Sequence, residues 1–149
     1  MGGLNKMSHI AQIDLKIKSL EALKAACARL GFEFVTGQTT YKWYGVFMGD
    51  YPMPEGMTRA DLGKCHHAIK VPGASYEIGI VEKNGEYIPM WDFWKAGGLE
   101  RILGQGGGRL KQAYSVEQAK ITARRAGYSV YEKLEPDKTV TLTMERRGA

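Results

Sequence analysis

The sequence has little cysteine, no long apolar run and no low-complexity segment. Its two cysteines, Cys27 and Cys65, are too few for the disulfide framework of a small secreted domain. No apolar run approaches the roughly 18 residues that a membrane span needs, and the N-terminus lacks the apolar region of a secretory signal. We therefore expect no membrane contact and predict a cytoplasmic protein.

What is present is ordinary for a folded protein. The 149 residues are 44% hydrophobic and 25% charged, which is typical of globular chains and not of disordered ones. A chain of this length buries roughly 68–70% of the surface that its unfolded form exposes. It therefore needs neither disulfides nor a structural metal to hold a core, and we expect one domain.

Positive charge is concentrated near the C-terminus. The net charge is +5, and residues 95–149 carry all of it, with eleven basic and six acidic side chains. A local basic surplus attracts phosphates or acidic partners. The alternative interpretation is a solvated helix face.

Apolar periodicity predicts two main helices. In the first, residues 19–30, the apolar residues fall in one arc, Ser19 stands at the N-cap position and Gly31 follows the last turn. The second, at about 109–126, has one apolar stripe and another of small residues. A shorter helix is expected at 99–103.

Period-two patterns predict strands around these helices, at 9–17, 32–35, 40–47, 67–71, 76–82, 87–94, 128–133 and 139–145. Asn84-Gly85 is typical of a two-residue hairpin turn, and Pro89 predicts an edge or bulged strand. Residues 48–66 form a long loop, and loops of this length are often functional.

This order predicts an α+β fold. We expect a ferredoxin-like sandwich of an antiparallel or mixed sheet with both helices on one face, an enlarged central loop and a C-terminal hairpin.

Several short motifs together resemble one family. They are MSHI (7–10), GQTTYKWYG (37–45), CHHAI (65–69), PGASYEIG (72–79), WDFW (91–94) and LKQAY (110–114). Over residues 7–145 the chain resembles the conserved hypothetical reading frame thirty-five of algal chloroplasts, known as domain of unknown function twelve fifty-seven.

That family occurs in cyanobacteria, plastids, other bacteria and phages, and it has no assigned activity. The resemblance implies a plastid stroma or a phage-infected cell as alternative locations. It also implies a single domain over 7–149, with residues 1–6 a leader or tag outside it.

A glycine-rich segment, residues 104–108, precedes the second helix. Glycines free backbone N–H groups to point at an anion, and a helix N-terminus adds partial positive charge. The segment is neither a Walker A motif nor a dinucleotide fingerprint. We predict an anion-binding loop here; a flexible hinge is the alternative. The predicted donors are Gly106, Gly107, Gly108, Arg109, Lys111, Lys120 and Arg124.

Aromatic residues gather in two segments, 41–51 and 87–94. At period two, Tyr41, Trp43 and Phe47, like Trp91 and Phe93, are expected in the core. Tyr44 and Trp94 fall on the opposite faces, where exposed aromatics would stack on bases.

Metal and catalytic chemistry have weaker signals. Cys65 and His67 would converge on one face of a strand, but no second spaced pair completes a zinc site, and Cys27 lies in the apolar arc of the first helix. We expect no metal and no cofactor.

Asp92 lies among aromatics and would make a small catalytic set with His67, and Glu77 is a similar carboxylate. The alternative for these carboxylates is an ion pair or a solvated side chain.

Our leading hypothesis is therefore a small accessory or binding domain without catalysis of its own. Its ligand would bear phosphate, as nucleic acid or a nucleotide does, and would bind at the glycine loop and the basic helix, with Tyr44 or Trp94 stacking. The first alternative is an interaction subunit of a larger protein assembly. The second is a small enzyme that uses His67 and Asp92.

Overall fold

The computed structural model describes residues 9–47, 49 and 52–148. Residues 1–6, expected to be a leader or tag, lie outside the described residues. The predicted α+β class is confirmed: an antiparallel sheet, three helices and a C-terminal hairpin form an architecture compatible with a ferredoxin-like sandwich. No helix in the described part of the chain has the length and apolar character needed to cross a membrane.

The sheet has five strands in the order β1-β5-β4-β3-β2, and each adjacent pair is antiparallel. The strands are β1 (Ile10–Gln12), β2 (Glu33–Thr36), β3 (His67–Lys70), β4 (Glu77–Lys83) and β5 (Glu86–Asp92). The helices are α1 (Leu20–Leu30), α2 (Leu99–Leu103) and α3 (Gly108–Arg125), and the hairpin is β6 (Tyr128–Leu134) with β7 (Val140–Arg146). Single turns of 3₁₀ helix occur at η2 (Arg59–Asp61), η3 (Lys95–Gly97) and η4 (Gln105–Gly107).

Both ends of α1 agree with the sequence prediction. The Ser19 hydroxyl accepts a hydrogen bond from the Ala22 N–H at 3.0 Å, which satisfies one of the free donors of the first turn. Gly31 adopts a left-handed conformation with φ 76°, which residues with a Cβ rarely adopt. The bounds of α1 therefore follow from local chemistry.

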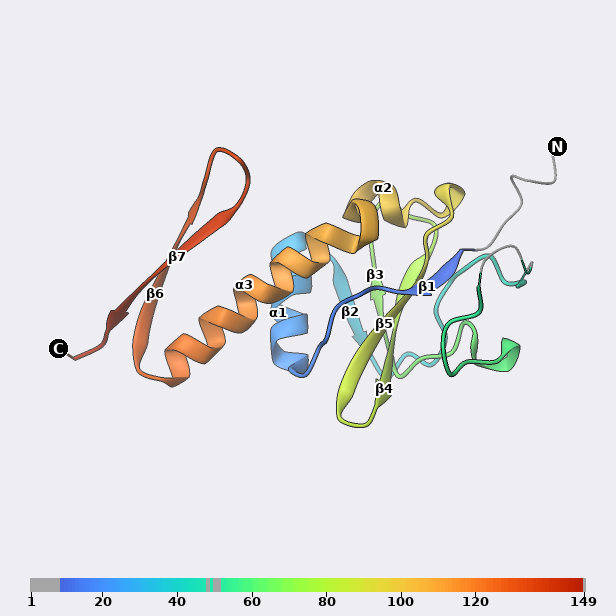
Figure 1. Cartoon of the computed structure of the whole chain (residues 1–149), viewed down its shortest axis with the longest axis horizontal. Helices are drawn as coiled ribbons and strands as arrows, with labels where there is room; N and C mark the ends of the chain where they lie inside the picture. Colours follow the sequence, from blue (N-terminus) through green and yellow to red (C-terminus); the bar gives the residue numbers. More distant parts are fainter. Residues whose placement is uncertain (1–8, 48, 50–51, 149) are drawn as a thin grey trace.

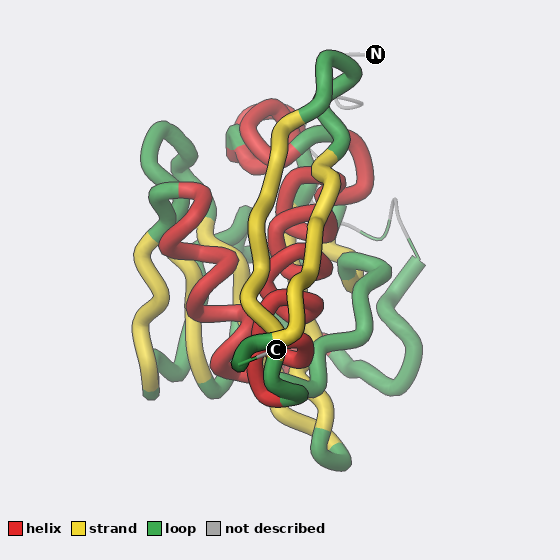
Figure 2. Tube along the Cα trace, turned by 90° about the vertical axis from the view of Figure 1, so that its left-hand side faces the viewer, coloured by secondary structure: helices red, strands yellow, loops and turns green. Residues whose placement is uncertain are grey.

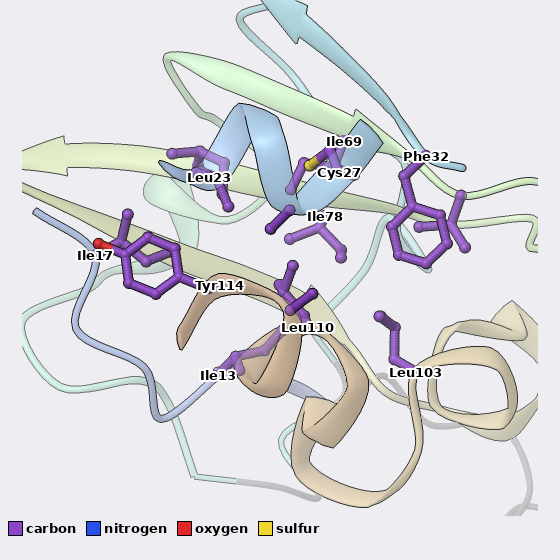
Figure 3. Close-up of a cluster of buried hydrophobic side chains, with 14 of the residues drawn as sticks. Ile13, Ile17, Leu23, Cys27, Phe32, Ile69, Ile78, Leu103, Leu110 and Tyr114 are labelled. Carbon is purple, nitrogen blue, oxygen red and sulfur yellow. The ribbon is translucent and has the colours of Figure 1, made fainter. Parts of the chain in front are cut away.

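α1 and α3 pack on the same face of the sheet, as predicted. In Figure 3, Leu23 and Cys27 of α1 and Leu110 and Tyr114 of α3 point toward the same buried layer, where the sheet contributes Ile78. The Tyr114 hydroxyl also accepts the Ser19 N–H at 3.2 Å, so α3 is bonded to the start of α1. These helices shield one apolar face of the sheet from water.

The long loop, described over residues 37–47, 49 and 52–66, covers the other face (Figure 1). Tyr41, Leu62 and Cys65 form a second core with Ala68 and Met90 of the sheet. The expected strand at 40–47 is wrong, since Thr40 makes only an isolated bridge with Lys64. Tyr41 is still buried in this core, and Trp43 and Phe47 pack against it, as expected.

Pro89 is accommodated in an interior strand. β5 lies between β1 and β4, and its register with β4 is continuous through Ile80 opposite Pro89. The Pro89 carbonyl accepts the Ile13 N–H at 2.8 Å, just beyond the end of β1. The missing N–H of the proline therefore faces the side where the β1 ladder has ended, and the predicted edge or bulge is wrong.

The C-terminal hairpin stands outside the main body. Figures 1 and 2 show it beyond α3, at the end of the molecule that lies away from the long loop. It contacts α3 mainly through β6. It forms a two-stranded sheet of its own.

Candidate functional site

The glycine-rich segment is a packing element. Gly107 is buried, and a Cβ there would come within 3.0 Å of the Ile13 side chain. Its N–H donates to the Gly104 carbonyl at 3.0 Å, and the Gly108 N–H bonds to Gln105. Two of the backbone donors predicted for an anion are thus occupied by internal hydrogen bonds, which corrects that prediction.

Arg109, which directly follows this segment, is also engaged locally. Arg109 donates to the Ile102 carbonyl at 2.9 Å and so ties α3 back to α2. Glu100 and Gly106 line one shallow pocket together with Trp91. An acidic side chain in this pocket opposes a phosphate, so the pocket beside Gly106 is not a built anion site. The Lys111 Nζ lies near Gly106, and its role as an anion donor stays a prediction.

Lys120 belongs to a network of four charged side chains. Its Nζ lies 3.2 Å from Glu117 and 3.1 Å from Glu132, while Arg29 lies 3.1 Å and 2.8 Å from the same two carboxylates. The network joins α1, α3 and β6. Because Glu117 and Glu132 already pair with Lys120, this side chain is not free to bind a phosphate. This corrects the prediction of a continuous basic stripe from Arg109 to Arg124.

Exposed arginines gather instead where α3 ends and β7 ends. We call Arg124, Arg125, Arg146 and Arg147 the arginine cluster. Arg147 bonds through a side-chain nitrogen to the Arg124 carbonyl and through its N–H to the Gly127 carbonyl at 2.8 Å. Arg125 pairs with Glu21 of α1 at 2.5 Å. Of the predicted residues, Arg124 is thus joined by three arginines that the helical wheel alone did not connect.

Tyr128 lies beside the arginine cluster and was not singled out from the sequence. The Arg146 guanidinium lies 5.1 Å from the centre of the Tyr128 ring and donates to the Tyr128 hydroxyl at 3.0 Å. The pairing follows from the hairpin register, in which Tyr128 lies opposite Arg146. The available signal was an aromatic residue and an arginine at the two ends of a predicted hairpin.

Tyr44 and Trp94 contact each other away from the basic helix. Their rings meet edge to face, with centroids 5.3 Å apart. Tyr44 belongs to the loop that covers the sheet face opposite α3, and its N–H bonds to Asp92. The predicted combination of these two rings with the α3 cations is therefore not present in one site.

Asp92 and His67 lie on opposite faces of the sheet. Asp92 is fully buried and accepts three backbone N–H bonds, from His9 at 2.9 Å, Tyr44 at 3.1 Å and Trp94 at 3.1 Å. His67 packs near Phe34 and Tyr87 on the helix side, and burial lowers its pKa. The predicted catalytic set is wrong, because the sheet separates its two members.

Glu77 has a structural role like that of Asp92. Only 7% of its surface is exposed, and its carboxylate accepts the Gln38 side-chain amide and the Lys42 N–H, each at 3.0 Å. Two buried carboxylates thus bind the backbone or side chains of one loop. Their function in this structure is to hold the loop against the sheet.

The cysteine and histidine residues do not converge. Cys65 packs in the second core and its thiol donates to the Gln38 carbonyl at 3.2 Å, while His67 lies on the other face. His66 accepts the Glu82 N–H on Nδ1 at 2.9 Å, and Cys27 is buried in the first core. Over the described residues, no group of three metal-binding side chains occurs.

A pocket of about 330 Å³ lies between the long loop and the sheet. Its apolar lining includes Met57, Val81 and Met90, and its charged lining includes Lys64 and Lys83. Sequence reasoning did not place this pocket, although the length of the loop was the signal for it. The remaining lining residues are Gln12, Pro54, Glu55, Gly56, Asp61, Cys65, His66 and Ile88.

Comparisons with known proteins leave the family open: no family model matches the chain, and neither a curated protein nor a solved structure matches it. The resemblance to the unknown-function family stays a prediction.

Proposed function

We propose that this chain is a binding module for phosphate-bearing polymers, with single-stranded nucleic acid as the preferred class, and that the arginine cluster is the contact surface. The observation that carries the proposal is the convergence of exposed arginines from two elements at the base of the hairpin. Guanidinium groups bind phosphate oxygens through two N–H donors at once.

The helix end accounts for only part of this positive charge. The C-terminus of α3 carries roughly half a negative charge from its aligned peptide dipoles, which favours nearby cations. Glu21 offsets Arg125 on the surface. The Arg147 guanidinium already donates to the Arg124 carbonyl. Arg124 and Arg146 together still exceed what the helix end can neutralise, and this surplus is available to a polyanion.

Tyr128 supports the choice of single strands. Its ring already stacks near one guanidinium, and aromatic and arginine planes are the surfaces on which unpaired bases stack. A polymer that places a phosphate on Arg124 and a nucleobase near Tyr128 would contact both α3 and β6, where the hairpin begins.

The test is a fluorescence anisotropy titration of labelled oligodeoxythymidine at several salt concentrations. Removing two phosphate contacts with Arg124→Ala/Arg146→Ala should flatten the slope of log K against log salt by roughly 1.4 units, since single strands contribute about 0.7 per contact. The matched control is Arg101→Ala/Arg109→Ala, which removes the same charge from α2 and from the first turn of α3 and should leave the slope nearly unchanged.

Two results would count against this function. Absence of binding by the unmodified chain at low salt would exclude it. A larger loss in the control than in Arg124→Ala/Arg146→Ala would move the contact to the glycine-rich segment.

The pocket under the long loop favours a second function, the binding of a small amphipathic anion. The apolar lining suits the apolar body of a ligand, and Lys64 and Lys83, which line the pocket together with the carboxylates Glu55 and Asp61, are the groups that would meet its acidic group. The dye anilinonaphthalene sulfonate has this chemistry. We expect Lys64→Ala/Lys83→Ala to weaken dye binding to the folded chain, while Lys16→Ala/Lys95→Ala does not; equal binding by both variants would exclude the pocket as the dye site.

A further inference from the structure

β7 presents an open strand edge. In the part of the chain that the structure describes, β7 pairs with β6 alone, and the hairpin contacts α3 mainly through β6. Figure 2 shows the hairpin standing in front of α3 as a separate pair of strands. A two-stranded hairpin is marginally stable in water by itself, and an open edge is a template for another strand.

The hydrogen bonds of the hairpin show which backbone groups face outward. The Arg147 N–H bonds to Gly127 and the Glu135 N–H bonds to Thr139, so the odd-numbered residues of β7 point their polar groups at β6. Directions alternate along a strand. The N–H and C=O groups of Val140, Leu142, Met144 and Arg146 therefore face the open edge.

This edge lacks the usual features that prevent pairing. Between Val140 and Met144 the sequence has no charge and no proline, and the β6–β7 register is continuous. Lysine, proline and bulges are the devices that protect natural edges. Thr141 and Thr143 alternate with apolar residues in this segment, a pattern that suits a paired strand.

The apolar side of the hairpin is incompletely covered. Leu134 is 69% exposed and Met144 55% exposed. They share this side with Glu132, which lies opposite Leu142 and reaches Lys120 of α3. The side thus faces the body of the molecule but retains apolar surface that a neighbour can bury.

We propose that a second copy of this chain pairs with β7 antiparallel, so that two hairpins form one four-stranded sheet. Pairing about a two-fold axis at Thr143 sets Leu142 opposite Met144 of the second copy and Val140 opposite Arg146 of the second copy. All four outward-facing residues then take part in the ladder. The apolar sides of the two hairpins become continuous, and they lie on the side of the sheet that faces α3 in each copy.

This register alone pairs all seven residues of β7 with β7 of the second copy. It places Arg147 opposite Thr139 of the second copy, beside the Asp137 carboxylate that Thr139 binds at 2.6 Å, within the reach of a diagonal pair. Sliding the strands by two residues in one direction leaves only five residues of β7 paired with β7. It sets Arg147 against Asp137 but also Arg146 against Lys138, two like charges, so the charges give no net gain. Sliding in the other direction separates Arg147 from Asp137 and sets Val140 against Gly148, beyond the end of the strand.

This inference goes beyond the proposed function and rests on different observations. Its test is a charge exchange on the two-fold axis, where residue 143 meets itself. Thr143→Lys and Thr143→Glu each place like charges face to face, so each variant alone should lose the dimer that the unmodified chain forms. An equal mixture of the two should restore a dimer, because opposite charges then meet.

The measurement is molar mass by light scattering behind a sizing column, with circular dichroism to confirm folding. Tyr131→Lys is the matched control, because it adds the same charge on the same side of the hairpin but on β6, and it should stay dimeric. A monomeric unmodified chain, a dimer of either residue-143 variant alone, a mixture that stays monomeric, or loss of the dimer in the control would each overturn the proposal.

Discussion

The carboxylate of Asp92 accepts the backbone N–H of Tyr44, 48 residues away in the sequence, at 3.1 Å. The same side chain also binds His9 and Trp94. One buried carboxylate therefore joins the residue before β1, the end of β5 and the long loop. Backbone N–H groups satisfy it without any basic side chain, as they do at helix N-caps.

Replacing Asp92 with Asn should destabilise the fold by about 3 kcal/mol. The amide keeps the size of the side chain, but it removes the charge and turns an N–H donor toward other donors. Chemical denaturation checks the change in the free energy of unfolding. Asp14→Asn, at an exposed position, should change it by less than about 0.5 kcal/mol.

Two glycine substitutions should change the stability of the protein in opposite directions. A Cβ at Gly79 would overlap the Tyr41 ring, whereas one at Gly108 meets open space. Gly79→Ala should therefore cost about 3 kcal/mol or more through overpacking. Gly108→Ala should stabilise the protein by up to about 1 kcal/mol, because alanine is the better helix former. Thermal unfolding of both variants checks the signs, and a neutral Gly79→Ala would contradict the packing of Tyr41.

Neither thiol should react readily in the folded protein. Burial raises the pKa of Cys27 to about 12 and that of Cys65 to about 11, and thiolates are the reactive form. Ellman's reagent at mildly alkaline pH should label both residues only after denaturation.

Cys27→Ser should lower the free energy of unfolding by about 1–3 kcal/mol, because it buries a hydroxyl. Stoichiometric zinc that this variant abolishes would contradict the assignment of Cys27 to the core.

The ion-pair network should make stability sensitive to acid. Burial raises the pKa of Glu132, but hydrogen bonds from Lys120 and Arg29 outweigh it and hold the pKa below its ordinary value of 4.5. The stabilisation is therefore complete above that ordinary value and is lost as pH falls through the lower pKa of the folded state.

The unfolding free energy of the unmodified chain should thus fall more steeply between about pH 5 and about pH 3 than that of Glu132→Gln. Denaturation curves across this range supply the measurement. Glu145→Gln, on the opposite side of the hairpin, is the control and should keep the steep dependence. Parallel curves for the unmodified chain and Glu132→Gln would rule out the network as the cause.

Several features were predictable because neighbours in the chain determine them. Ser19 and Gly31 cap α1 as expected, and Asn84 and Gly85 adopt positive φ angles of 53° and 77° in the hairpin turn. A cap, a two-residue turn and a helical apolar face depend on residues within a few positions of each other. The α+β class and the shared face of α1 and α3 followed from these local signals and from the one-sided burial of the first helix.

The candidate sites depended on pairings between distant segments, and the sequence did not contain them in readable form. Glu132 joins Arg29 across 103 residues and removes Lys120 from the expected basic stripe, while β4 and the sheet plane separate His67 from Asp92. Helical and strand periodicity state which side of its own element a residue occupies. They do not state which other element covers that side, because the packing of the whole chain decides it, and that packing turned the aromatic segment at 40–47 from an expected strand into the cover of a second core.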